Sequence, residues 1–192
     1  KLGQLPALRS LKCIFNDALV SLSFKGLTNL SDVQCGSNPQ LSIIETGEKI
    51  NVRSLSIGDC AFRSLEFINS FPLLQELSCS SNNLTSLDLS ELPLLRSVDC
   101  SDNKKLVHLQ IPEQNSVNPI LQNLDCSFCY LDEKELNAIF CVLPVAPNPY
   151  PEYPSGYGIT FNGNPGSENC DRKLVEDKGW NIFVNPEDLI NR

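Results

Sequence analysis

The sequence predicts an α/β solenoid in which each turn of the chain contributes one short strand to a long parallel sheet. Three observations predict this fold. Cysteine recurs every 21 to 22 residues over much of the chain, aliphatic residues precede it at fixed distances, and asparagine or cysteine follows it three residues later. A fixed period of this length is typical of solenoids, whose turns bury a continuous core only by stacking on one another.

The strand of each turn is marked by one anchor residue. The six anchors are Cys13, Cys35, Ile57, Cys79, Cys100 and Cys126. Aliphatic side chains stand two and five residues before every anchor, so the shared pattern is LxxLxCxxN. Because side chains alternate along a strand, the anchor and the aliphatic residue two before it point into the core, and the residue between them points outward.

The third residue after each anchor forms a polar slot that turns the chain off the strand. The slot holds Asn16, Asn38, Cys60, Asn82, Asn103 and Cys129. An asparagine amide can bond backbone groups that have no partner in the sheet, so we expect the stacked asparagines to form a ladder. Cysteine fits the same slot as a small buried side chain with a weak donor.

A second, weaker LxxLxL pattern begins about half a turn after the anchors and predicts a second extended segment on the convex side. It comprises Leu19, Leu22 and Phe24; Phe62, Leu65 and Phe67; Leu84, Leu87 and Leu89; and Leu106, Leu109 and Ile111. Turns of 21 to 22 residues leave no room for a long helix there. The longer step from Cys100 to Cys126 places an insertion near residues 112–119.

Residues 132–192 predict a C-terminal cap that belongs to the same domain as about six repeats in residues 1–131. Apolar residues at helical spacing predict a helix over 132–144, with Asp132 as N-cap and Pro144 after its end. Residues 145–158 form a loop rich in proline and tyrosine, and residues 159–164 repeat the strand pattern. A short helix ending at Gly179 and a last strand follow, which gives seven or eight strands.

These motifs resemble those of leucine-rich-repeat proteins, whose motif is LxxLxLxxN/CxL. Cysteine replaces the third leucine in five of six repeats, and the resemblance is strong over residues 5–131. The half-repeats, together with GNPG, Cys-Asp and KGW near the C-terminus, are similar to secreted or surface-anchored bacterial members. The resemblance implies a right-handed solenoid with a concave sheet, a binding function, and an extracellular or cell-surface location, with a cytoplasmic location as the alternative.

The charge of the chain restricts its partners. A net charge of -8 argues against nucleic acid or an anionic membrane surface, both of which require clustered lysine and arginine. We expect no membrane span, because no apolar run reaches the roughly 18 residues that a span needs. We also expect a monomer. The sequence lacks methionine and begins inside a repeat, so we expect a trimmed piece of a longer chain.

The nine cysteines predict packing more than chemistry. We expect free, buried thiols, since the Cβ vectors of parallel strands in register do not converge on a disulfide. The single histidine, His108, lies half a turn from any anchor, so cysteine catalysis is not expected, and no enzyme activity or cofactor is predicted. Zinc at Cys126, Cys129 and Cys141 is the weaker alternative, and we expect no metal.

The outward strand residues are the candidate binding site. They are Lys12, Gln34, Ser56, Ser78, Asp99 and Asp125. Asp99, Asp102 and Asp125 leave calcium as an alternative to solvated carboxylates. Tyr150, Tyr153 and Tyr157 either contact a partner or pack over the cap. We therefore predict a non-catalytic protein that binds a protein or glycan ligand; the alternative is an intracellular adaptor or the recognition module of a larger multidomain effector.

Overall fold

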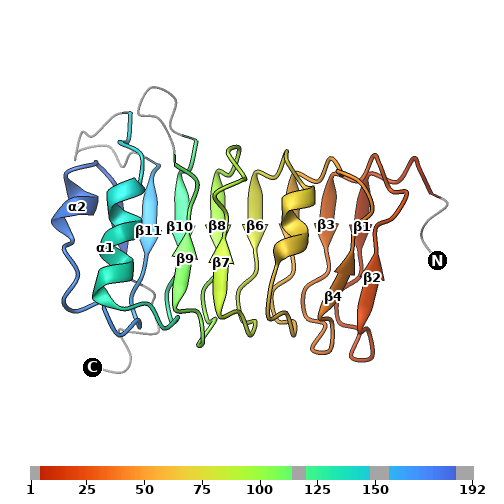
Figure 1. Cartoon of the computed structure of the whole chain (residues 1–192), viewed down its shortest axis with the longest axis horizontal. Helices are drawn as coiled ribbons and strands as arrows, with labels where there is room; N and C mark the ends of the chain where they lie inside the picture. Colours follow the sequence, from red (N-terminus) through yellow and green to blue (C-terminus); the bar gives the residue numbers. More distant parts are fainter. Residues whose placement is uncertain (1–4, 114–119, 148–155, 185–192) are drawn as a thin grey trace.

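A computed structural model describes residues 5–113, 120–147 and 156–184, and Figure 1 shows their turns stacked side by side in one row. Eight short parallel strands form one sheet, here called the long sheet, in the order β1-β3-β5-β6-β8-β10-β11-β12. The strands are β1 (Ser10–Lys12), β3 (Asp32–Gln34), β5 (Ser54–Ser56), β6 (Glu76–Ser78), β8 (Ser97–Asp99), β10 (Asn123–Asp125), β11 (Gly158–Thr160) and β12 (Asn181–Phe183). The predicted α/β solenoid with its long parallel sheet is confirmed.

The repeat pattern sets the register of the long sheet. The central residue of each strand is the aliphatic residue two before the anchor, so that Leu55 pairs with Leu77 and Leu77 with Val98. These central side chains point into the core, where Val33, Leu55 and Val98 are each 1% exposed. The 26-residue step does not disturb this order, because Leu124 still pairs with Val98.

The other side of the solenoid carries shorter elements. Two small sheets pair β2 (Ser21–Ser23) with β4 (Ile43–Glu45) and β7 (Ser86–Asp88) with β9 (His108–Gln110). The extended segment expected around Leu65 and Phe67 is wrong: the chain there forms the 3-10 helix η1 (Glu66–Ser70). Three aromatic side chains explain the difference, since Phe67 packs against both Phe62 and Phe71, with ring centroids 5.8 and 6.0 Å apart.

The asparagine ladder is present and links each turn to the one before it. The side-chain amide of Asn38 donates to the carbonyl oxygens of two successive anchors, Cys13 and Cys35, at 2.7 Å each. Asn82, Asn103 and Asn164 repeat this arrangement on the anchors of their own and the preceding turn. Where cysteine fills the slot, its thiol donates to the preceding anchor, as Cys60 does to the Cys35 oxygen at 3.4 Å.

The residue just before each polar slot adopts a left-handed backbone conformation. Phe15, Ser37, Asp59, Ser81, Asp102 and Phe128 all have φ between 52° and 57°. This conformation is uncommon outside glycine, so its recurrence in six turns is a property of the repeat. In the following turn Gly163 takes the position at φ 73°, and the ring of Phe128 lies only 2.4 Å from where a Cβ of residue 163 would be.

The C-terminal cap contains the helices α1 (Glu133–Val142) and α2 (Lys173–Glu176), at the opposite end from β1 (Figure 1). The side chain of Asp132 accepts a hydrogen bond from the Glu135 amide and caps α1, as predicted. The Lys178 ammonium donates to the Cys141 and Leu143 oxygens, both at 2.6 Å, and satisfies carbonyls at the end of α1. None of the described helices is long and apolar enough to cross a membrane.

The cysteines are free thiols in this structure. Seven of the nine are buried, whereas Cys13 is half-buried and Cys141, near the end of α1, is exposed. Burial raises the pKa of Cys79 and Cys126, which keeps these thiols protonated and unreactive. The expected column of buried thiols is therefore present behind the long sheet, with its least buried member in the first turn.

Candidate functional site

The long sheet has one face that points away from the core, here called the open face. It is lined by the first and third residues of each strand, among them the six predicted site residues. Lys12 and Gln34 are exposed, and the other four, Ser56, Ser78, Asp99 and Asp125, are half-buried. Parallel sheets are usually covered on both faces, whereas here the longest helix, α1, contacts β9 on the other side of the solenoid.

Polar contacts between neighbouring strands order the middle of the open face. The Ser54 hydroxyl donates to the Glu76 carboxylate at 3.1 Å across β5 and β6. The Ser78 hydroxyl lies 3.4 Å from Asp99 Oδ2 across β6 and β8. The sequence could not reveal these pairs individually, because they join residues that are 22 and 21 positions apart.

Two site carboxylates are held by serines that the sequence interpretation passed over. Asp99 Oδ1 accepts hydrogen bonds from the backbone amide and the hydroxyl of Ser101, at 3.1 and 2.7 Å. Asp125 Oδ1 is bound in the same way by Ser127, at 2.9 and 2.6 Å. Each unit is an aspartate turn in which the side chain bonds the backbone two residues on. The signal for it was the tripeptide Asp-Cys-Ser, which occurs at both places.

The part of the open face over β8 and β10, here called the acidic part, carries an electrostatic penalty. Burial raises the pKa of Asp125, and the negative charges of Asp99 and Asp102 raise it further, while the Ser127 hydrogen bonds oppose the shift. A cationic group would relieve this repulsion. Among the residues that the structure describes, no group of three or more histidine, cysteine or acidic side chains is arranged to hold a metal ion. The calcium and zinc alternatives therefore find no ligand cluster there.

The structure describes one of the three tyrosines predicted to contact a partner or to pack over the cap. Tyr150 and Tyr153 lie outside the described residues. Tyr157 is only 6% exposed, and its ring packs edge-on against Trp180 with centroids 5.5 Å apart. The structure thus places Tyr157 in the cap beside β11, where little of its ring is available to a partner.

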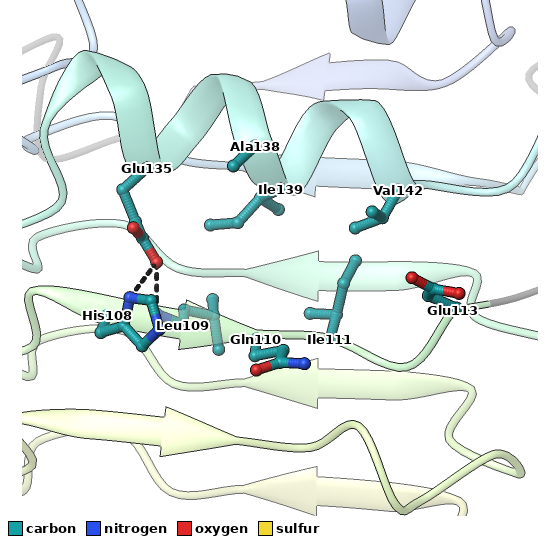
Figure 2. Close-up of a pocket in the computed structure, with 9 residues that line it drawn as sticks. All are labelled: His108, Leu109, Gln110, Ile111, Glu113, Glu135, Ala138, Ile139 and Val142. Atoms are coloured by element: carbon teal, nitrogen blue, oxygen red, sulfur yellow. Dashed lines mark hydrogen bonds and ion pairs between the residues drawn. The ribbon is translucent and has the colours of Figure 1, made fainter.

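A separate small hollow lies between β9 and α1, and Figure 2 shows its lining. Its volume is about 190 Å³, and its apolar walls include Leu109, Ile111 and Ile139. Glu135 Oε1 lies 2.9 Å from both the Leu109 amide nitrogen and His108 Nδ1. This side chain of α1 therefore accepts a hydrogen bond from a backbone amide at the edge of β9. Glu135 could not be anticipated from the sequence, because its partner His108 is 27 residues away.

The chemistry of this hollow is limited by its lining residues. They contain one histidine and two glutamates but no serine, cysteine or lysine. A histidine–carboxylate pair can orient an imidazole, yet no side-chain hydroxyl or thiol nucleophile accompanies it among these described residues. The Glu135 contact is therefore explained by the covering of the β9 edge.

No protein-family model matches the sequence, and no curated protein matches it either.

Proposed function

We propose that this protein is a non-catalytic binding protein of the leucine-rich-repeat type, which recognises a protein or glycan ligand on its open face. The observation that carries this proposal is the uncovered polar face of an eight-stranded parallel sheet. Stacked turns hold that face rigid, so its side chains are positioned before a ligand arrives. The proposal rests on the polar residues of this face and on the resemblance of the repeats to leucine-rich-repeat proteins.

The open face carries a basic residue at β1 and acidic residues at β8 and β10, which favours a ligand with mixed polarity. Lys12 stands exposed on β1, whereas Asp99 and Asp125 stand on β8 and β10. The serines at positions 56 and 78 lie between them on adjacent strands and leave room for a ligand group to approach the backbone. A cationic ligand group fits best over β8 and β10, because Asp99 and Asp125 stand on neighbouring strands there, and the charge of Asp99 adds to the burial that raises the pKa of Asp125.

The proposed location is the cell surface or the extracellular medium. The support is the resemblance of the repeats and cap to secreted bacterial leucine-rich-repeat proteins. A net charge of -8 agrees with a protein that remains dispersed in solution through like-charge repulsion.

The test is a binding screen with two matched variants. Ligands are first selected for the parent protein from a glycan array and from a displayed library of random peptides. The open-face variant Ser56→Arg/Ser78→Arg adds two long side chains to β5 and β6. We expect it to bind the selected ligands at least about tenfold more weakly than the parent, because the arginines obstruct the centre of the face.

The control variant Ser21→Arg/Ser86→Arg adds the same charge and bulk to β2 and β7, where both serines are exposed on the other side of the solenoid. It should bind like the parent. Unchanged binding by the open-face variant would exclude this face as the site. Failure of the parent to select any peptide or glycan would count against the binding function itself.

A further inference from the structure

Two thiols of adjacent turns touch at the N-terminal end of the solenoid. Cys13 Sγ and Cys35 Sγ are 3.1 Å apart, although they lie 22 residues apart in the chain. Both are anchors, placed directly after β1 and β3. The sulfur atoms therefore converge at this pair, contrary to the expectation from Cβ vectors alone, because the side-chain torsions also set the distance between them.

The backbone around this pair satisfies the requirements of a disulfide. β1 and β3 pair in register, and the Cys13 amide donates to the Gln34 oxygen at 2.8 Å, so the two strands remain adjacent up to the cysteines. Neighbouring strands lie about 4.8 Å apart. Disulfides are formed between Cα atoms about 4.4 to 6.8 Å apart, so a bond needs movement of the side chains and little of the backbone.

One member of the pair, Cys13, is accessible in the described chain, unlike the equivalent thiols in later turns. Cys13 is half-buried and lines an open hollow of about 570 Å³ with Leu19 and Leu22. Cys79 and Cys100 occupy the same positions after β6 and β8, but both are 0% exposed. A dissolved oxidant can thus reach Cys13 and is excluded from the middle of the column.

We propose that Cys13 and Cys35 are a modification site, at which a low-molecular-weight disulfide of the glutathione class oxidises them to an intramolecular disulfide. The Cys13 thiolate attacks one sulfur of the small disulfide, and a mixed disulfide forms as one small thiolate leaves. Cys35 then gives its proton to that thiolate and attacks Cys13 Sγ, so that the second small molecule leaves as a thiolate and takes up the proton that Cys13 lost on ionising. The two protein thiols are oxidised, and one small disulfide is reduced to two thiols.

The order of these steps follows from the burial of the two sulfurs. Cys35 is 0% exposed, and burial followed by the contact with Cys13 raises the pKa of its thiol. Attack on a dissolved disulfide therefore begins at Cys13, and Cys35 acts as the resolving thiol. The product is a covalent bond between the turns that carry β1 and β3.

The test uses the full chain carrying Cys141→Ser, so that the exposed thiol of α1 does not react. The reduced protein is incubated with excess oxidised glutathione, alkylated in denaturant and digested without reduction. We expect a cross-linked peptide pair containing Cys13 and Cys35, two hydrogen atoms lighter than the sum of its parts. The number of alkylated thiols should fall from eight in the reduced protein to six.

Two further variants separate the proposal from general oxidation. Cys35→Ser should stop at the mixed disulfide, with one glutathione on Cys13, whereas Cys79→Ser should retain the Cys13–Cys35 cross-link. Glutathione that accumulates on Cys13 in the parent without a cross-link would overturn the proposal. So would cross-links at Cys79 or Cys100, because they would show that burial does not protect the column.

Discussion

At the scale of single residues, aspartates on the two sides of the solenoid titrate in opposite directions. Asp125 is partly buried, and its pKa is raised by that burial and by Asp99 and Asp102. Asp88 on β7 is exposed, and the hydroxyl and amide of Ser90 lower its pKa. Both aspartates bind a serine two residues on, so the difference between them lies in burial and in neighbouring charge.

The raised pKa of Asp125 predicts that Asp125→Asn is more stable than the parent at neutral pH. The folded state holds this proton more tightly than the unfolded state, whose pKa is near 3.8. Folding stability from this group is therefore fully present below pH 3.8 and is lost as pH rises through the folded pKa. Asparagine does not ionise and keeps an oxygen for Ser127. Thermal unfolding is measured near pH 7 and below pH 3.8. The variant should have a higher unfolding temperature than the parent near pH 7 and the same unfolding temperature below pH 3.8.

Asp88→Asn is the matched control, and its sign is opposite. Its folded pKa is lowered, so the ionised carboxylate adds stability above the unfolded pKa and loses it as pH falls through the folded pKa. The variant should be slightly less stable than the parent at neutral pH. If the unfolding temperature of Asp125→Asn at neutral pH is no higher than that of the parent, the electrostatic penalty inferred for the acidic part of the open face is wrong.

At the scale of elements, the asparagine ladder supplies hydrogen bonds between turns that longer strands would otherwise supply. Each strand has only three residues, so the sheet alone forms few hydrogen bonds per turn. Asn82 bonds the carbonyl oxygens of Ile57 and Cys79 and accepts from the Phe62 amide, which joins three segments of two turns. The slot is therefore the joint between one turn and the next.

Asn82→Ala should reduce the free energy of unfolding by about 2 to 4 kcal/mol, because it leaves buried backbone groups without partners. Urea unfolding followed by far-ultraviolet circular dichroism measures the loss. The adjacent Asn83 is exposed and offers a close control. Asn83→Ala should change the value by no more than about 0.5 kcal/mol. Equal losses in the two variants would mean that the ladder contributes no more than an ordinary surface amide.

At the scale of the whole molecule, the turns differ in how well the core is covered. Leu74, Leu77 and Leu84 in the central turns are at most 2% exposed. Leu11 and Leu22 in the first described turn are only partly buried. Because each turn of a solenoid contacts chiefly its neighbours, local opening begins at the less covered end.

Hydrogen exchange should reveal this gradient. Backbone amides of β1 and β2 should exchange faster than those of β6 and β8, when followed by mass spectrometry of peptides under native conditions. The middle of the sheet serves as the internal reference within the same sample. Identical protection of β1 and β8 would show that the whole solenoid opens as one unit.

The periodic pattern was sufficient to predict the architecture, because a buried aliphatic at each strand centre fixes both register and facing. It could not predict η1, since the spacing of apolar residues does not show that Phe67 packs against Phe62 and Phe71 of its own turn. Nor did it reveal the recurring left-handed position, because Phe15, Ser37 and Asp59 share no side-chain chemistry. On the open face the pattern identified the outward residues. It could not predict the hydrogen bonds of Ser101 and Ser127 to the aspartates, or the Cys13–Cys35 contact behind the sheet, because these depend on side-chain torsions.

The cap has a consequence for spectroscopy. Trp180 is the single tryptophan of the chain, it is 4% exposed, and its indole N–H donates to the Pro144 oxygen at 2.7 Å. Its emission therefore reports the surroundings of one end of the molecule. A melting curve recorded by tryptophan fluorescence follows the detachment of the cap, and only a backbone signal such as circular dichroism follows the repeats.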